Sequence, residues 1–141
     1  MEQRYTMITL GVNDLPTSTG FFETLGWRRS VKEAPGISFF QCGSVAIALY
    51  PKSELARDAN VALDDRGSGT FAIAYNTRTK EEVDTVLRQA KSAGAEIVKP
   101  AEEAFWGGYS GCFRDLDGHL WEVAWNPGFP LDDKGAVHLP D

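Results

Sequence analysis

Apolar and polar positions along the first half of the chain predict one strand, one helix and then three strands. Asp14 and Pro16 are typical of a helix start, and Gly26 is typical of a helix end. Runs rich in β-branched and aromatic residues surround this helix, and turn residues separate them. The strands are predicted over 6–12, 27–33, 37–42 and 44–51.

The second half repeats this order from Thr70 onward. A helix is predicted over 79–94, because Thr79 and Glu82 have the spacing of a capping box and Gly94 lies where a helix-ending glycine belongs. Its apolar positions share one face, and Asp84 and Arg88 are spaced to pair on the other. The strands are predicted over 70–76, 95–100, 109–115 and 119–125. The chain therefore reads as two tandem βαβββ units, an α+β fold.

The polar segment between the units is rich in turn residues. We therefore assign unit one to 5–50, a linker to 51–69 and unit two to 70–126, within one domain that spans 1–141. The tail, 127–141, contains three prolines and two glycines and is expected to be irregular.

Side-chain size alternates along four of the predicted strands. Because successive residues of a strand point to opposite faces, bulky residues such as Leu10, Ile47 and Val123 form one face, which we expect to pack under the helices. The other face combines mostly small side chains with Glu122. Its members are Met7, Thr9, Gly11, Ala46, Ala48, Tyr50, Thr70, Ala72, Ala74, Leu120, Glu122 and Ala124.

Composition excludes several classes of protein. The net charge is −6 and the isoelectric point is near 4.9, which argues against a nucleic-acid-binding surface. The sequence has no apolar run of membrane-spanning length and no signal-peptide core, so neither a membrane nor export is expected. Cys42 and Cys112 are expected to be reduced thiols in a cytoplasmic protein.

Together with the tandem βαβββ order, the segments "GVNDLP", "FFETLGW" and "DLDGHLWEVAWNP" carry a family resemblance. The chain resembles the vicinal oxygen chelate superfamily, which includes glyoxalase I, bleomycin-resistance proteins and extradiol dioxygenases. One departure is Leu116, where that family usually has proline. The resemblance implies a curved mixed sheet that encloses a cup-shaped cavity lined by the small-residue face. A sheet or partner subunit packed closely on that face is the alternative.

The resemblance also implies four metal-ligand positions, which here hold Met7, Ala48, Thr70 and Glu122. Only Glu122 suits a hard or borderline divalent ion, so we predict no metal and no cofactor. Neither His119 nor His138 supplies a replacement ligand, and both are expected to be exposed.

A carboxylate among apolar side chains requires a partner, and Glu122 has three interpretations. A protein donor, for example Arg114 or Thr70, would make it a structural remnant. A raised pKa would make it a general acid or base. A ligand amine or hydroxyl would make it a binding group.

Aromatic residues give the other indication of ligand chemistry. Phe105, Trp106 and Tyr109 lie in a glycine-flanked segment, and Phe39 faces the same space if Cys42 and Gly43 form a two-residue turn. Alternatively, Phe105 and Trp106 plug the end of the cup as core residues. Cys112 is interpreted as a packed thiol.

The leading hypothesis is a metal-independent protein that binds or sequesters a small apolar or aromatic molecule. The rival is a lyase or isomerase in which Glu122, the predicted catalytic residue, transfers a proton, and a pure interaction domain is the third hypothesis. The expected partners are the small-molecule ligand and, from the resemblance, a second copy in a homodimer. The predicted ligand-binding residues are Phe39, Ala48, Thr70, Trp106, Tyr109 and Met7.

Overall fold

The computed structural model describes residues 7–59, 72–105 and 107–137 of the chain. The chain divides into two compact units, Met1–Arg66 (unit 1) and Gly67–Asp141 (unit 2). Their boundary falls inside the range 51–69 that the sequence assigns to a linker. Among the helices of the described residues, none is both long and apolar enough to cross a membrane.

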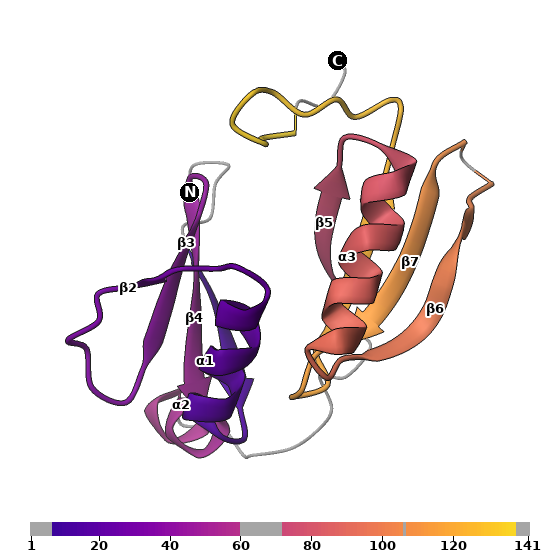
Figure 1. Cartoon of the computed structure of the whole chain (residues 1–141). Coiled ribbons are helices and arrows are strands. Elements are labelled where there is room, and N and C mark those ends of the chain that lie inside the picture. The colour runs from indigo at the N-terminus through magenta and orange to yellow at the C-terminus, as the bar shows by residue number, and fades with distance from the viewer. Residues whose placement is uncertain (1–6, 60–71, 106, 138–141) are drawn as a thin grey trace. The chain divides into compact units, whose positions relative to one another are not determined.

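Unit 1 contains one mixed sheet and two helices (Figure 1). In chain order its elements are β1 (Met7–Val12), α1 (Leu15–Thr24), β2 (Arg29–Ser30), β3 (Ser38–Cys42), β4 (Val45–Pro51) and α2 (Lys52–Ala59). The strands lie side by side in the order β1-β4-β3-β2, with β1 parallel to β4 and the other neighbours antiparallel.

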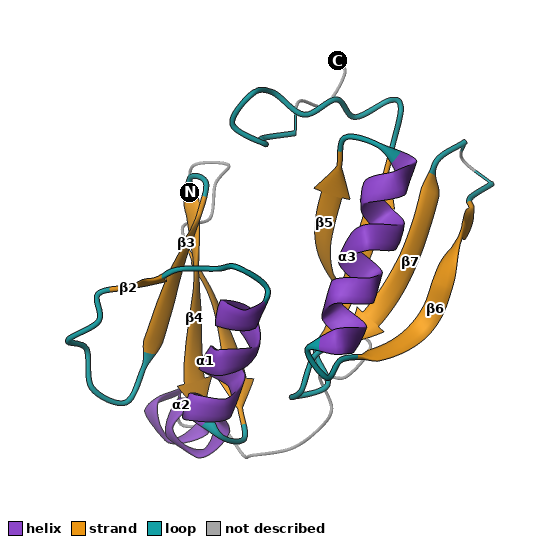
Figure 2. Ribbon diagram, in the orientation of Figure 1, coloured by secondary structure: helices purple, strands orange, loops and turns teal. Residues whose placement is uncertain are grey.

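Unit 2 repeats this arrangement with one helix across one face of its sheet (Figure 2). Its elements are β5 (Ile73–Thr77), α3 (Lys80–Ser92), β6 (Glu96–Glu103), β7 (Tyr109–Arg114) and β8 (Leu120–Trp125). The strand order is β5-β8-β7-β6, and β5 runs parallel to β8. Two four-stranded mixed sheets with helices confirm the predicted α+β class. The cup-shaped enclosure stays a prediction.

Both repeated helices begin and end as the sequence predicts. The Asp14 side chain accepts a hydrogen bond from the Thr17 amide at 2.8 Å, and the Thr79 hydroxyl accepts one from the Glu82 amide at 3.3 Å. The helices α1 and α3 both end in a Schellman motif. The amide of Trp27 bonds the Phe22 carbonyl, and the amide of Ala95 bonds the Ala90 carbonyl. Gly26 and Gly94 have the positive φ values, 91° and 105°, that this motif requires.

Helix α1 packs on the bulky face of its sheet. The Thr19 hydroxyl donates to the Ser38 hydroxyl at 2.9 Å, and both side chains are buried. The rings of Phe22 and Phe40 lie 5.8 Å apart. Leu10, Leu49 and Ser38 are register partners across the sheet, so the bulky face lies under α1 as predicted.

Helix α3 packs on the corresponding face of unit 2. Its buried residues are Val83, Leu87 and Ala90. The helix approaches Gly111 so closely that a Cβ there would lie 2.7 Å from the Leu87 Cδ1 atom, and it would also lie 2.8 Å from the Lys99 carbonyl oxygen of the neighbouring strand β6. Only glycine fits this contact. The predicted Asp84–Arg88 pair is not formed, because Asp84 accepts from Tyr109 and Arg88 donates to Thr85.

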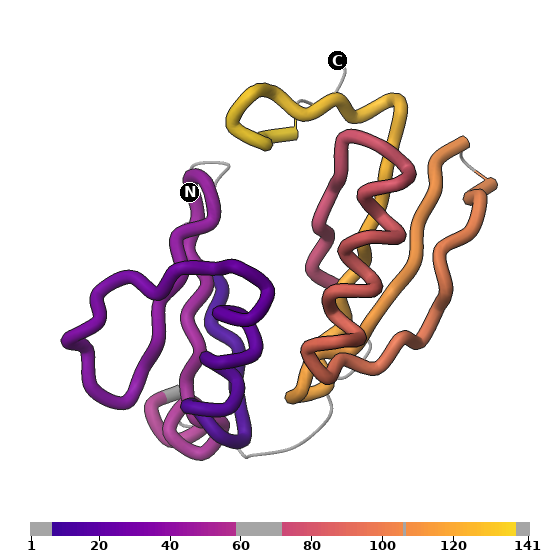
Figure 3. The backbone as a smooth tube through the Cα atoms, viewed as in Figure 1, coloured from indigo at the N-terminus to yellow at the C-terminus, as the bar shows by residue number. Residues whose placement is uncertain are grey.

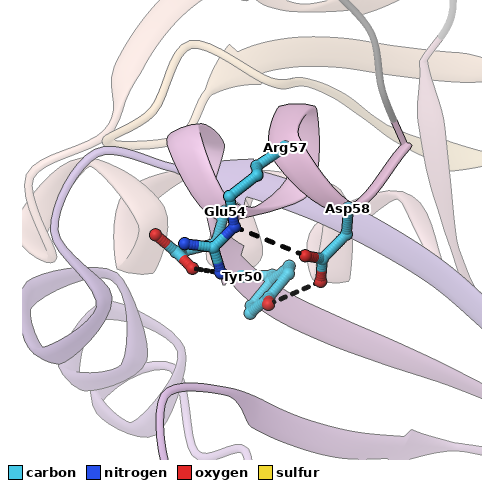
Figure 4. A network of polar contacts seen from close by, with 4 residues as sticks. All are labelled: Tyr50, Glu54, Arg57 and Asp58. Atoms are coloured by element: carbon cyan, nitrogen blue, oxygen red, sulfur yellow. Dashed lines mark hydrogen bonds and ion pairs between the residues drawn. The ribbon is translucent and has the colours of Figure 1, made fainter.

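Helix α2 was not predicted, since its residues fall in the expected linker. It lies on the face of unit 1 opposite to α1, because a Cβ at Gly11 would point 2.9 Å from the Lys52 Cγ atom. The hydroxyl of Tyr50, the register partner of Gly11, donates to the Asp58 carboxylate at 2.8 Å (Figure 4). Helix α2 therefore covers one end of the small-residue face of unit 1.

Ion pairs along α2 complete this polar network. The Arg57 guanidinium contacts the carboxylates of Glu54 and Asp58 (Figure 4). The hydrogen bond to Asp58 raises the pKa of Tyr50, so this hydroxyl stays protonated and keeps donating.

Strand β2 is shorter than the predicted strand over 27–33. Val31 follows it with a φ of 47°, a conformation that is rare for β-branched residues and ends the pairing. The Arg29 guanidinium holds the loop beyond it by donating to the carbonyls of Ala34 and Ile37 at 3.3 and 3.0 Å.

The tail turns back on itself after Trp125 (Figure 3). The Asp132 carboxylate accepts from the amides of Lys134 and Ala136, both at 2.9 Å, and Leu131 and Val137 form an isolated bridge. The Arg78 guanidinium donates to the Asp132 carbonyl at 2.9 Å, which ties the tail to unit 2. The described part of the tail, 127–137, is thus irregular, as predicted, but ordered by side-chain hydrogen bonds.

Candidate functional site

Three of the predicted ligand-binding residues share one face of the unit 1 sheet. Register partners in a sheet point to the same side, and Thr9, Ala48 and Phe39 form one such row. Met7 lies on the same side, opposite Ala46. The β3–β4 turn is Gly43–Ser44 rather than Cys42–Gly43, but this change moves the register by two residues and leaves Phe39 on the predicted face.

Exposure differs widely among these residues. Met7 is 46% exposed, and Phe39 is half-buried. Ala48 is fully buried, so it offers no surface that a ligand could contact. Thr70 lies outside the described residues.

In unit 2, one row of partners surrounds Glu122 on the face away from α3. Ala74 of β5 lies on one side of Glu122 and Cys112 of β7 on the other, with Lys99 of β6 beyond Cys112. Ser110 and Ala124, both buried, form the next row on this face. We call the three residues Ala74, Glu122 and Cys112 the Glu122 strip.

The loop between β7 and β8 sets this juxtaposition. It has five residues, 115–119, which pairs Arg114 with Leu120 and hence Cys112 with Glu122. A two-residue turn at Asp117 and Gly118 would have put Phe113 opposite Glu122. One loop residue more or fewer exchanges the two faces of a strand, so the loop decides which side chain meets the carboxylate.

Asp115 organises the loop. Its carboxylate accepts hydrogen bonds from the Asp117 and His119 amides, both at 3.0 Å, and from the Trp121 indole at 3.1 Å. Burial raises the pKa of Asp115, while His119 and the three donors oppose that rise. His119 is half-buried and interacts electrostatically with Asp115, so the expectation of an exposed histidine was wrong. His138 lies outside the described residues.

Glu122 is half-buried, and no described residue forms a hydrogen bond or ion pair with its carboxylate. Arg114, one suggested partner, lies 3.9 Å from the Glu96 carboxylate instead. The structural-remnant interpretation therefore has no protein donor among the described residues.

The negative charge of Glu122 affects the neighbouring thiol of Cys112. Burial is the main reason that the pKa of the Cys112 thiol is raised, and the negative charge of Glu122 adds to the rise, whereas Lys99 opposes it. Cys112 is consequently a protonated thiol near neutral pH. This agrees with the interpretation of a packed, unactivated cysteine.

Tyr109 lies on the other face of the sheet. It pairs with Trp125, points toward α3 and donates to the Asp84 carboxylate at 3.1 Å. The Lys80 ammonium lies 5.2 Å from the Trp125 ring and 2.7 Å from the Glu103 carboxylate. Tyr109 thus supports the helix and does not share a face with Glu122, which differs from the grouping expected from sequence.

The aromatic segment before β7 forms the tip of the β6–β7 hairpin. Phe105 is fully exposed there, so it does not serve as a core plug. The amide of Ala104 bonds the Gly108 carbonyl at 2.8 Å and closes the tip. Trp106 lies outside the described residues.

The donor set does not fit a divalent metal ion. Of the four positions that the resemblance implies, Met7 offers a thioether, Ala48 offers no donor atom, and Glu122 alone offers a carboxylate. Throughout residues 7–59, 72–105 and 107–137, no three His, Cys, Asp or Glu side chains lie together as a metal site would need.

Comparison with known proteins gives the family. Residues 4–123 match the Glyoxalase/Bleomycin resistance protein/Dioxygenase superfamily, and the chain belongs to it. The match confirms the resemblance drawn from the sequence motifs.

Several relatives cover nearly the whole chain. A glyoxalase-related enzyme from Fulvimarina pelagi has a similar structure, with a TM-score of 0.89, 34% identity and 99% of each chain covered. The uncharacterized protein PA2024 of Pseudomonas aeruginosa is 27% identical, with 99% of each chain covered. A lactoylglutathione lyase from Agrobacterium tumefaciens shares the fold, with a TM-score of 0.68, 24% identity, and 89% of this chain and 96% of that chain covered.

Proposed function

We propose that this protein is a metal-independent member of the superfamily that binds a small apolar or aromatic molecule, with Glu122 as the polar anchor. The observation that carries the proposal is the half-buried Glu122 carboxylate without a hydrogen-bond or ion-pair partner among the described residues. A carboxylate without a protein donor can accept a hydrogen bond from a ligand, and hydrogen bonds to charged groups are stronger than those between neutral groups.

The surroundings of Glu122 support a binding role. Ala74 and Cys112 on either side are small and cannot neutralise the carboxylate. Phe39 and Met7, which belong to unit 1, are proposed as ligand contacts from the sequence alone. Thr70 and Trp106 remain proposed contacts from the sequence.

Titration of a neutral aromatic probe, 1-naphthylmethanol, against the wild type and Glu122→Gln tests this function. Glutamine keeps the shape of the side chain but removes its charge, so the variant should bind the probe more weakly by about 1.5–3 kcal/mol. Glu102→Gln is the matched control, because Glu102 lies on the same face but is paired with Lys99. Absence of saturable binding to the wild type would contradict the proposal.

An enzyme that uses Glu122 for proton transfer is the second candidate. Its support is the 34% identical relative described as a glyoxalase-related enzyme. A general base contributes typically about 10²–10⁴-fold to rate, so Glu122→Gln would then retain binding while turnover of a carbonyl substrate falls by that factor. If Glu122→Gln lost binding and the wild type showed no measurable turnover, the binding function would be favoured over the enzyme.

We also propose a symmetric homodimer and a cytoplasmic location, both from the sequence and the family resemblance. Each unit has strand edges that a second copy could cover. Light scattering at micromolar concentrations tests the assembly. A mass of 15.5 kDa, that of one chain, would contradict the dimer.

A further inference from the structure

The face of unit 2 that carries Glu122 has an unbalanced set of charges. Its strands place three acidic and two basic side chains on this face. They are Glu96, Glu102, Glu122, Lys99 and Arg114. One negative charge is therefore in excess on this face.

The two basic side chains are already engaged with other acids. The Lys99 ammonium lies 3.1 Å from the Glu102 carboxylate, and the Arg114 guanidinium lies 3.9 Å from the Glu96 carboxylate. These side chains are substantially exposed, whereas the neighbours of Glu122 in its own row are alanine and cysteine. The excess charge is therefore localised at Glu122.

A hydroxyl and a cation would compensate this charge differently. A ligand hydroxyl donates one hydrogen bond but leaves the negative charge in a half-buried setting. A cation supplies a donor and also an opposite charge, whose Coulomb attraction adds to the charge-assisted hydrogen bond that a hydroxyl would make as well. The raised pKa of Cys112 agrees with this view, because burial and the Glu122 charge both disfavour a second anion beside the carboxylate.

We infer that the Glu122 strip recognises a cationic group, so that the ligand is a small organic ammonium compound whose charged end lies between Ala74 and Cys112. This inference rests on the proposed binding function and narrows it to one ligand class. The small Ala74 side chain leaves space for the ammonium group, and the Cys112 sulfur supplies a polarizable, uncharged contact.

Three probes of one shape test the ligand class. We would titrate 1-naphthylmethylamine, 1-naphthylmethanol and 1-naphthoate against the wild type, Glu122→Gln and Glu102→Gln. The amine should bind the wild type at least about tenfold more tightly than the alcohol, and this preference should vanish in Glu122→Gln but persist in Glu102→Gln. Naphthoate should bind most weakly.

A second measurement needs no ligand. In a Cys42→Ser background, Cys112 would react with cationic trimethylammonium-ethyl or anionic sulfonatoethyl methanethiosulfonate, whose sulfinate leaves as the mixed disulfide forms. For Cys112, the rate of reaction with the cationic reagent is divided by the rate with the anionic reagent. This ratio is then divided by the same ratio measured for glutathione, which removes the intrinsic difference between the reagents. We expect at least about a fivefold excess at low salt, lost in Glu122→Gln.

The outcomes separate this inference from the proposed function. Equal binding of amine and alcohol overturns the cationic ligand but leaves a binding protein. If no probe binds, the proposed function fails, and the cationic ligand class fails with it. If the probes bind, a reagent ratio near one overturns the inference, and a ratio that depends on Glu122 supports cation recognition at the strip.

Discussion

Units 1 and 2 share the order βαβββ but differ on the face turned away from α1 and α3. In unit 1, α2 covers part of that face. The strand residues paired on that face include no Asp, Glu, Lys, Arg or His. In unit 2, the same face carries Glu122, and the one described helix of the unit lies on the opposite side.

The helix-covered faces, in contrast, follow one plan. Each has a helix with a side-chain N-cap, a Schellman end and a bulky strand face beneath it. The comparison indicates that the repeated pattern specifies the core, whereas the opposite face is free to acquire a cover in one unit and a carboxylate in the other.

The largest effect is expected where a helix meets a glycine in unit 2. Gly111→Ala should destabilise the protein by about 2–3 kcal/mol, because the new Cβ would meet backbone atoms of β6 as well as Leu87. Urea denaturation measures the change. Gly20→Ala is the control: its site within α1 is open, so alanine should stabilise by about 0.5–1 kcal/mol. Equal effects of both variants would contradict the close packing of α3.

A smaller effect is expected from the loop that sets the register of Glu122. Asp115→Asn loses the acceptor for the Trp121 indole, so it should cost about 1 kcal/mol at pH 7. Because the folded-state pKa of Asp115 is raised above 3.8, wild type gains stability as the pH falls through that folded pKa toward 3.8, and asparagine does not. The difference between the two proteins should therefore grow on acidification. If the stabilities of wild type and Asp115→Asn changed in parallel from pH 7 to 4, protonation of Asp115 would not contribute to the pH dependence of stability.

The smallest effect is expected in unit 1. Gly11→Ala places a Cβ against the flexible Lys52 side chain rather than against backbone, so the loss should stay below about 1 kcal/mol. The same urea titration measures it. A loss as large as that of Gly111→Ala would mean that α2 is held as rigidly as α3, which would remove this difference between the units.

Local sequence signals were reliable where the interaction itself is local. Asp14 and Thr79 cap their helices, and Gly26 and Gly94 end them, because capping involves residues three to five positions apart. Helix α2 escaped prediction because an eight-residue, mostly polar helix depends on tertiary packing against Gly11 and Tyr50. The consecutive helix formers Glu54, Leu55, Ala56 and Arg57 were the signal that could have indicated it.

The candidate site was predicted in part. The face of Phe39 was identified correctly, because the observed turn differs from the assumed one by an even register shift. The face of Tyr109 and the proximity of Cys112 to Glu122 were not identified. Both depend on the pairing of β7 with β8, which the five-residue loop around Asp115 determines.

The sequence by itself therefore determined the two βαβββ units, the helix ends, the bulky and small faces, and the family. The tertiary structure alone decided which residues from different elements meet: α2 over Gly11, Tyr109 with Asp84 of α3, and Cys112 beside Glu122 on the neighbouring strand. The physical reason is that side-chain periodicity is fixed within a strand, whereas register between strands depends on loop geometry and long-range packing, and a shift of one residue exchanges the two faces.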